Sequence, residues 1–174
     1  MNAQLQLHHD SQAAFIKAID VEVHRPRPDR LTLRYHLTGD LSHIVYPPPA
    51  TPARTDNLWR HTCFEAFIGL PGGGYIEFNL APSRQWAAYL FDGYRHGIRP
   101  HEVADPHIAI SAVGGLNLTA DIDIPTEASR LGLSAVIEAR NGSKSYWAIA
   151  HAPGHPDFHN RDGFAVELPP VEAM

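Results

Sequence analysis

Alternation of apolar and polar residues with a period of two runs through most of this chain, and it restricts the fold more than any other feature. In residues 30–37, RLTLRYHL, three leucines and a tyrosine fall on one side and polar residues on the other. Side chains of a strand point alternately to opposite faces, so this pattern predicts a half-buried strand. Similar runs recur, separated by turn-forming residues in a chain with 15 prolines and 13 glycines. We therefore expect strands joined by turns.

The turns predict an antiparallel arrangement. PGGG at 71–74 closes one hairpin, the glycine pair at 114–115 a second, and Asn141-Gly142 a third. The proline-rich segment 47–57 is unsuited to a strand, and 92–106 is expected as an irregular loop. Strands are expected at 30–37, 41–46, 58–70, 75–81, 85–91, 107–113, 116–124, 130–140, 145–151 and 164–168. With no convincing amphipathic helix and no repeat, the sequence predicts an all-β fold, an antiparallel β-sandwich of about ten strands that forms a single domain over residues 1–174.

Charge and cysteine content narrow the class of protein. The net charge is −5 and no run of lysine and arginine occurs, so we expect no nucleic-acid partner. The single cysteine, Cys63, excludes an internal disulfide and is expected as a small buried hydrophobe. No stretch approaches the length of an apolar membrane span, and residues 1–15 lack the pattern of a signal peptide. These features predict a cytoplasmic protein without a membrane partner.

The hairpin over residues 58–80 carries the clearest candidate site. With PGGG as its loop, Phe67 opposes Glu77 and Glu65 opposes Asn79. One face is then apolar throughout, whereas the other mixes aromatic rings with carboxylates, an amide and an imidazole. This second face carries Trp59, His61, Cys63, Glu65, Phe67, Tyr75, Glu77 and Asn79. Flat apolar rings beside hydrogen-bonding groups suit a small polar ligand such as a sugar.

Other interpretations of this face stay open. It can be a structural layer under the proline-rich loop, with its carboxylates paired to Arg60 or Arg84. It can be catalytic, because Glu65 and Glu77 lie diagonally, roughly 7–8 Å apart, and inverting glycosidases hold their carboxyl groups roughly 6.5–9.5 Å apart. A pure interaction module would instead present a large apolar patch. The loop 92–106 can cover the face, and its arginines can hold an anionic group.

Three histidines recur at every fourth position in HAPGHPDFHN, residues 151–160. This spacing would align His151, His155 and His159 on a helix, as in zinc sites, but the prolines and glycine of the segment exclude a helix. The segment is therefore predicted as a loop. Three roles stay open: a metal site of two histidines with Asp157, a plain connector, and a rim in which Asp157 caps backbone amides beside His159.

Residues 58–95 resemble the DOMON-like domains of the DOMON and family-9 carbohydrate-binding-module superfamily. The resemblance is carried by the tryptophan-initiated strand that ends in Glu65-Ala66-Phe67, by Tyr75-x-Glu77-Phe78-Asn79, and by the turn Ala81-Pro82-Ser83 that leads into QWAAYLFDGYR. Residues 146–168 also look like the closing segment of bacterial stand-alone members. In the family pattern a lysine often stands where this chain has His155, which makes His155 the weakest of the loop candidates.

The resemblance implies a β-sandwich that binds a carbohydrate or haem and is not itself an enzyme. Haem-binding members use a Met/His axial pair, whereas the only methionines here are Met1 and Met174, so His/His ligation is what remains for haem. Sugar-binding members place tryptophans around the ligand, and this chain has Trp59, Trp86 and Trp147.

These observations lead to one expected function and one alternative. We expect a non-catalytic domain that binds a small molecule, either a carbohydrate or a haem-like cofactor. The candidate ligand-binding residues are Trp59, His61, Glu65, Tyr75, Glu77, Asn79, Trp86, Asp157 and His159. We assign no catalytic residue and no metal ligand. The alternative is a metal-dependent or carboxylate-based hydrolase that uses Glu65 and Glu77 or the histidines of 151–159.

Overall fold

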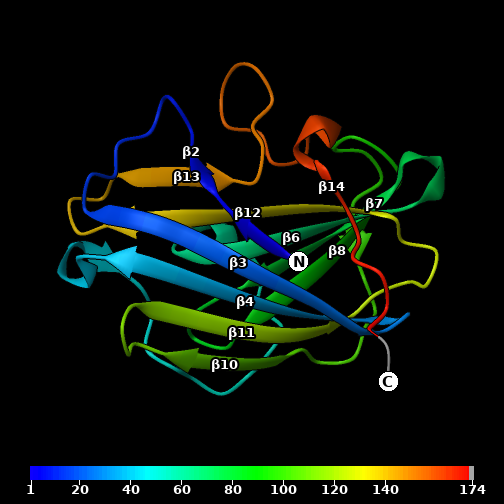
Figure 1. The fold of residues 1–174 in the computed structure, drawn as a ribbon, viewed down its shortest axis with the longest axis horizontal. Helices are drawn as coiled ribbons and strands as arrows, with labels where there is room; N and C mark the ends of the chain where they lie inside the picture. Colours follow the sequence, from blue (N-terminus) through cyan, green and yellow to red (C-terminus); the bar gives the residue numbers. More distant parts are fainter. Residues whose placement is uncertain (173–174) are drawn as a thin grey trace.

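The computed structural model describes residues 1–172 and shows an antiparallel β-sandwich of two sheets (Figure 1). The first sheet has the order β1 (Asn2–Gln4), β3 (Ile16–Arg27), β4 (Arg30–Gly39), β11 (Leu116–Asp123) and β10 (His107–Ser111). The second has the order β2 (Gln6–Leu7), β13 (Lys144–Ala148), β12 (Arg130–Ala139), β6 (Cys63–Gly69), β7 (Tyr75–Leu80), β8 (Trp86–Phe91) and β9 (Arg99–Pro100). Two short strands, β5 (Ile44–Val45) and β14 (Val166–Glu167), pair with β12. The predicted all-β sandwich is confirmed.

The core lies between the two sheets. The predicted inward face of β4 is almost completely buried and meets the apolar face of β6 and β7. Tyr35 packs its ring against Phe64, with 4.9 Å between the ring centroids, and its hydroxyl donates a hydrogen bond to the carbonyl of Glu65 at 2.7 Å. The hydroxyl is therefore buried together with its hydrogen-bond partner.

The central hairpin has the predicted register. Glu65 lies opposite Asn79, and Phe67 lies opposite Glu77. The pairing continues into β8, where Tyr89 lies opposite Glu77. The apolar face of this hairpin, including Phe64, belongs to the main core, so the polar and aromatic face must point away from it.

Several expected strands are shorter than the alternation suggested, and two of them begin with a 3-10 turn. Residues 58–70 begin as a 3-10 turn, and pairing starts only at Cys63, because Asn57 adopts a left-handed conformation with φ of 63° and redirects the chain. Residues 41–46 likewise begin with a 3-10 turn, which Asp40 caps through the amide of Ser42. The 3-10 turns of the described residues are Leu41–His43, Leu58–Arg60, Pro71–Gly73 and Arg161–Gly163. The long strand β3 and the short β1, β2 and β9 were not expected from the sequence.

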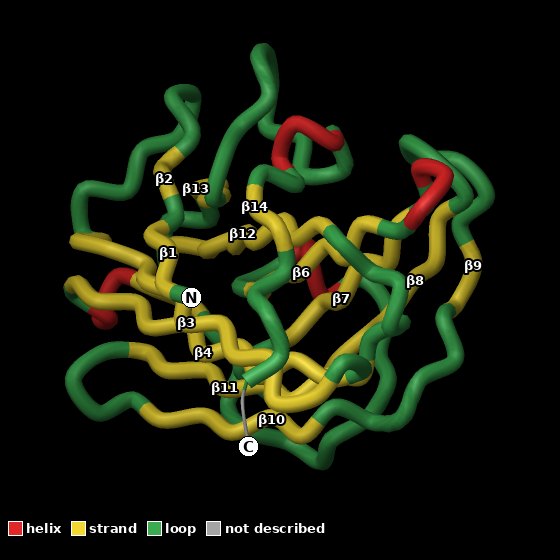
Figure 2. Tube along the Cα trace, turned by 45° about the vertical axis from the view of Figure 1, so that its right-hand side comes forward, coloured by secondary structure: helices red, strands yellow, loops and turns green. Residues whose placement is uncertain are grey.

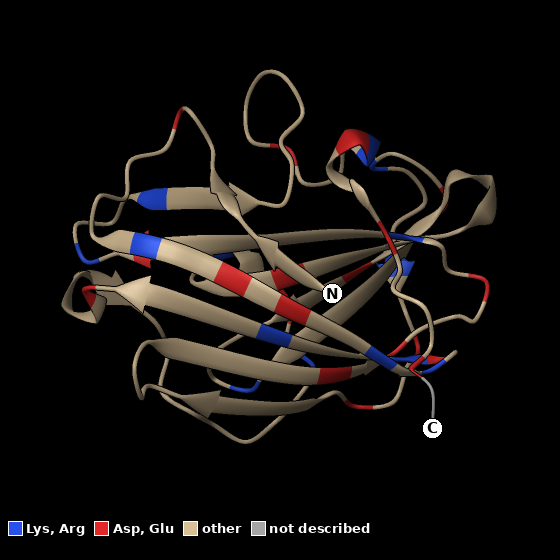
Figure 3. Ribbon diagram, in the orientation of Figure 1, with Lys and Arg blue, Asp and Glu red and all other residues tan. Residues whose placement is uncertain are grey.

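The outer face of the first sheet is a charged, solvated surface. Figure 3 shows acidic and basic positions along the ribbons of β3 and β4. Glu22 and Arg34 form an ion pair there at 3.4 Å, and both side chains are about half exposed. Exposed pairs of this kind contribute little stability. In Figure 2, long loops project at the edge of the sandwich where β2, β13 and β14 lie. No helix among residues 1–172 is long and apolar enough to cross a membrane.

Candidate ligand-binding site

A cavity of about 670 Å³ opens on the outer face of the second sheet. Its floor consists of Glu65, Phe67, Glu77, Tyr89, Phe91 and Val136, which project from β6, β7, β8 and β12. Its walls come from three loops and contain Asp56, Asn57, Trp59, Arg95, Ile98, Pro100, Pro156, Phe158 and His159, with Tyr146 of β13 beside them. The polar and aromatic face predicted for the hairpin therefore lines a cavity. A purely structural layer would instead be packed without such a cavity.

Two carboxyl groups lie on the floor, and both are almost completely buried. Glu65 is 3 % exposed and Glu77 is 6 % exposed. The hydroxyl of Ser134 donates to Glu65 Oε2 at 3.0 Å, and the amide of Asn79 donates to Glu77 Oε1 at 2.8 Å. Ser134 occupies the position on β12 that pairs with Glu65, so the sheet register itself supplies the partner.

The pKa values of both carboxyl groups are raised, and that of Glu65 is raised further than that of Glu77. Burial, followed by the nearby charge of Glu77, raises the pKa of Glu65 to about 8. Burial also raises the pKa of Glu77, to about 6, although the hydrogen bond from Asn79 and the charge of Arg95 lower it in part. At neutral pH Glu65 is therefore protonated and can donate a hydrogen bond, while Glu77 is mostly ionised and accepts.

A chain of polar contacts connects Glu77 to the loop after β13. The hydroxyl of Tyr75 lies 2.8 Å from His159 Nδ1 and accepts the backbone N–H of Arg95 at 3.2 Å. If the hydroxyl donates to Nδ1, the proton of the neutral imidazole is on Nε2, which faces Glu77 Oε2 at 3.7 Å. Burial and the charge of Arg95 lower the pKa of His159 to about 4, so the ring is neutral at physiological pH.

Asp157 fastens this loop over the cavity. Its carboxylate accepts from Arg95 at 2.7 Å, from the hydroxyl of Tyr94 at 2.6 Å and from the backbone amide of His159 at 3.2 Å. Partial burial raises the pKa of Asp157, but the hydrogen bonds from Tyr94 and Arg95 outweigh this and lower it overall. Of the roles left open for this loop, the capping of a backbone amide by Asp157 is present in the structure.

Aromatic rings surround the imidazole and form the apolar part of the cavity. The ring of His159 stands edge-on to Phe67 and Phe91, with centroid distances of 5.3 and 5.1 Å. Tyr75 stacks on Phe91 at 4.6 Å. Trp59, whose ring is partly covered by the guanidinium of Arg60, remains 48 % exposed at the rim. The cavity thus offers flat apolar surfaces on its sides and hydrogen-bonding groups at its base.

Four of the nine predicted residues line this cavity, namely Trp59, Glu65, Glu77 and His159, and two of the other five, Trp86 and His61, lie away from it. Trp86 belongs to the main core and is 2 % exposed, because on β8 it points to the face opposite that of Tyr89. His61 is exposed before the start of β6 and its Nδ1 lies 2.8 Å from Glu138. Tyr75 and Asn79 are themselves fully buried, and they act on the cavity only through His159 and Glu77.

The arginines considered as partners for the carboxylates lie elsewhere. Arg60 stacks on Trp59, and Arg84 belongs to the turn before β8, where its Nε is buried without a hydrogen-bond partner within the described residues. The cation close to Glu77 is Arg95, which comes from the loop 92–106. Cys63 is fully buried, as expected, with its sulfur 3.9 Å from Asn79 Oδ1.

Several residues of the cavity were not singled out from the sequence. Tyr89 and Phe91 follow the alternation of β8 on the side of Glu77, so extending the hairpin register by one strand would have found them. Arg95 belongs to the loop 92–106, which the sequence offered as a cover of this face, whereas Tyr146 and Phe158 had no such signal, because their approach depends on how distant loops pack over the sheet.

The three regularly spaced histidines go to three different places. His151 Nε2 lies 2.8 Å from the carbonyl of Gln6, His155 approaches Asp10, and only His159 lines the cavity. Within residues 1–172 no metal-binding group containing Asp157 is formed.

No protein-family model matches this chain, and no curated protein or solved structure is significantly similar to it. The functional interpretation therefore depends on the geometry of the cavity.

Proposed function

We propose that this protein is a non-catalytic binding domain for a small, neutral, polyhydroxylated molecule, with a carbohydrate as the favoured class. The observation that carries the proposal is the cavity on the second sheet, which combines two buried carboxyl groups with aromatic walls. Its volume of about 670 Å³ falls in the range typical of small-molecule sites.

The charges of the lining favour an uncharged ligand. Glu65 is protonated at neutral pH, His159 is neutral, and the charge of Arg95 is matched by Asp157. This leaves Glu77 as an acceptor and Glu65 as a donor at the base of the cavity. A sugar hydroxyl both donates and accepts, so it can satisfy these two groups at once, while its C–H faces pack on the aromatic rings.

Haem fits this cavity less well than a sugar. Among residues 1–172, His159 is the only histidine that lines the cavity; its Nδ1 is engaged by Tyr75 and its Nε2 faces Glu77. Neither ring nitrogen is free to ligate iron without breaking the chain that holds the loop. The resemblance to DOMON-like domains supports a binding function, and between the two ligand classes of that superfamily the residues present support the sugar.

The proposal is tested by titrating the protein with a panel of saccharides and, in parallel, with hemin. A bound sugar should change tryptophan fluorescence, because Trp59 lies on the wall of the cavity whereas Trp86 and Trp147 are buried in the core. Trp59→Phe should abolish the fluorescence change, and Glu77→Gln should weaken binding by about 1–3 kcal/mol because the ligand loses a charged acceptor. Val113→Ala, which alters a residue 84 % exposed elsewhere, is the matched control.

The outcomes separate the ligand classes. Saturable binding of a saccharide that is lost in Glu77→Gln supports the proposal. A shifted Soret band with hemin, lost in His159→Gln, would favour haem instead. No response to any saccharide or to hemin would contradict the assignment of the cavity as a site for either class.

A carboxylate-based hydrolase is the second candidate. The specific observation in its favour is that Glu65 and Glu77 have pKa values separated to about 8 and about 6, the relation expected of a general acid and a general base. Release of reducing sugar from oligosaccharides, or of nitrophenol from aryl glycosides, measures this activity. Turnover that disappears in Glu65→Gln while ligand binding persists would establish hydrolysis, and binding without turnover in the unmodified protein would exclude it for those substrates.

A further inference from the structure

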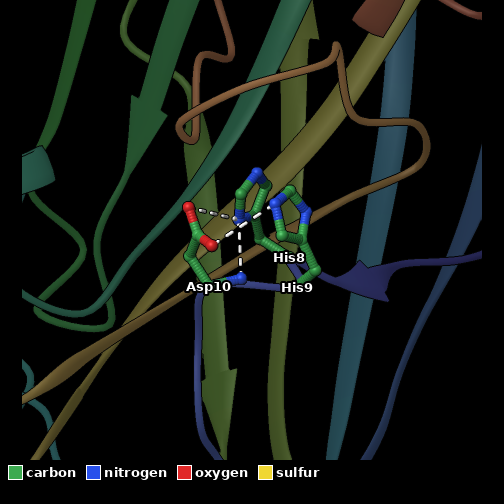
Figure 4. A group of neighbouring side chains, drawn as sticks. All are labelled: His8, His9 and Asp10. Atoms are coloured by element: carbon green, nitrogen blue, oxygen red, sulfur yellow. Dashed lines mark hydrogen bonds and ion pairs between the residues drawn. The ribbon is translucent and has the colours of Figure 1, made fainter.

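A second group of ionisable side chains lies outside the cavity, where the chain leaves β2. His8, His9 and Asp10 turn toward one another (Figure 4), and one potential ligand atom from each lies within 4.8 Å of the others. His9 Nε2 is 3.3 Å from Asp10 Oδ1, and His8 Nδ1 is 4.0 Å from Asp10 Oδ2. The side chain of His8 is completely buried, whereas those of His9 and Asp10 are 70 % and 47 % exposed, so the group is open to solvent on one side.

The distant histidine-rich loop offers a further candidate ligand, His155, beside the three residues of this group. His155 Nδ1 lies 3.6 Å from Asp10 Oδ2, although its side chain is 99 % exposed. Asp10 is its only polar partner among the described residues. An exposed imidazole gains little from such a contact with one carboxylate, but a cation between them would hold both groups.

The rest of the cluster is held in place by groups outside it. The amide of Asp10 donates to His8 Nδ1 at 3.1 Å, which keeps that nitrogen unprotonated and leaves the proton on Nε2, buried without a partner in the described structure. The rings of His8 and His9 lie 4.2 Å apart, and His151 packs edge-on against His8 at 4.8 Å while it contacts the carbonyl of Gln6. Such fixed imidazoles lose little freedom when a ligand binds.

We propose that His8, His9, Asp10 and His155 form a site for one divalent transition-metal ion of the zinc class. Ligand atoms around a tetrahedral zinc ion with bonds of about 2.0–2.1 Å are separated by roughly 3.4 Å. His9 Nε2 lies 3.3 Å from Asp10 Oδ1, whereas His155 Nδ1 and His8 Nδ1 lie 3.6 and 4.0 Å from Asp10 Oδ2, so each separation is near this edge and the carboxylate must rotate to present one oxygen to all three nitrogens. The metal bond replaces the hydrogen bond that His8 Nδ1 accepts from the amide of Asp10.

The donor set selects among cations. Three imidazole nitrogens and one carboxylate suit Zn²⁺, Ni²⁺ or Cu²⁺, whereas Ca²⁺ and Mg²⁺ prefer sites composed of oxygen. His155 belongs to the loop that also carries Asp157 and His159. The metal would therefore attach this loop to residues 8–10, in addition to the contacts that Asp157 makes. This site is independent of the ligand proposed for the cavity.

Isothermal titration of the tag-free, chelator-stripped protein with Zn²⁺ tests the proposal. We expect one equivalent to bind at neutral pH, and Ca²⁺ and Mg²⁺ to give no saturable signal. His9→Gln and Asp10→Asn should each weaken the affinity at least about tenfold, and His155→Gln should do the same because its side chain is a ligand.

A matched control and a second readout keep the result unambiguous. His107→Gln removes another exposed histidine, which lies 4.0 Å from Asp121, and it should leave zinc binding unchanged. Zinc should raise the thermal unfolding midpoint of the unmodified protein and not that of Asp10→Asn. Absence of saturable binding, binding that survives both Asp10→Asn and His155→Gln, or equal losses in His107→Gln would each overturn the proposal. His155→Gln changes a fully exposed side chain, so it tests the site even if another variant fails to fold.

Discussion

Glu65 is a carboxylic acid that the fold holds away from water with the hydroxyl of Ser134 as its partner. A buried carboxyl beside a second one keeps its proton at neutral pH, because ionising both would place two like charges in a poorly solvated site. This gives the floor of the cavity a hydrogen-bond donor next to an acceptor, Glu77. Which group donates and which accepts a hydrogen bond at the base of the cavity therefore depends on the difference between the pKa values of Glu65 and Glu77.

Glu65 should make the stability of the protein depend on pH. Its pKa rises from 4.5 to about 8 on folding, so its contribution to the free energy of unfolding is complete below about pH 4.5 and is lost as the pH rises toward 8. Glu65→Gln should flatten the decline over this interval, by at most about 1.4 kcal/mol for each pH unit. Urea unfolding at several pH values measures the effect.

The contribution of Glu65 is isolated by comparing Glu65→Gln with the unmodified protein, because other groups also make the stability depend on pH. Glu77 acts in the same direction as Glu65, whereas His159, whose pKa falls to about 4, destabilises the folded state as the pH drops below its usual value. Glu127→Gln, which changes an exposed carboxylate, is the control and should keep the profile of the unmodified protein. Parallel profiles for Glu65→Gln and the unmodified protein would show that Glu65 is ionised in the native state.

The loop between β13 and β14 is the element on which the cavity depends most. It has no pairing of its own and is held by Asp157, which contacts Tyr94, Arg95 and the amide of His159. Loops of this kind, which are not part of a sheet, open locally at a much lower cost than the strands of a core. The loop can therefore be loosened without unfolding the sandwich.

Removal of the Asp157 carboxylate should loosen the loop locally and leave the global free energy of unfolding nearly unchanged. Asp157→Ala should cost about 1 kcal/mol or less in global unfolding, since Arg95 is half exposed and its ion pair is well solvated. Hydrogen exchange at the amide of His159 should nevertheless accelerate strongly, and saccharide affinity should fall with it. Asp105→Ala, at an exposed position in another loop, should change neither quantity. Unchanged exchange at His159 would mean that other contacts hold the loop.

At the scale of the whole molecule, the two sheets share one core, and we predict that they unfold together. Phe78 is fully buried on the inner face of β7, so Phe78→Ala should destabilise the protein by about 3–5 kcal/mol. Val113→Ala should cost less than about 0.5 kcal/mol, because its side chain is 84 % exposed. Tryptophan fluorescence and far-UV circular dichroism should report the same single transition, and two separate transitions would contradict a single domain.

The faces of the central hairpin could be predicted from sequence because the information is local. PGGG and the alternation around it determine which residues lie opposite one another, and the structure confirms that Glu65 pairs with Asn79 and Phe67 with Glu77. The same holds for the hairpins at Gly114-Gly115 and Asn141-Gly142. The chain itself therefore determines strand pairing, hairpin register and the grouping of polar and aromatic residues on one face.

Only the tertiary structure decides which face meets which neighbour. Every residue of β6 and β7 is buried, whichever face it points to, so alternation alone could not show that one face of these strands meets the other sheet while the opposite face lines a cavity. The contacts of His159 with Tyr75 and of His155 with Asp10 likewise join segments that are far apart in the sequence. Such contacts depend on how loops pack over a finished sheet, and no short-range periodicity encodes them.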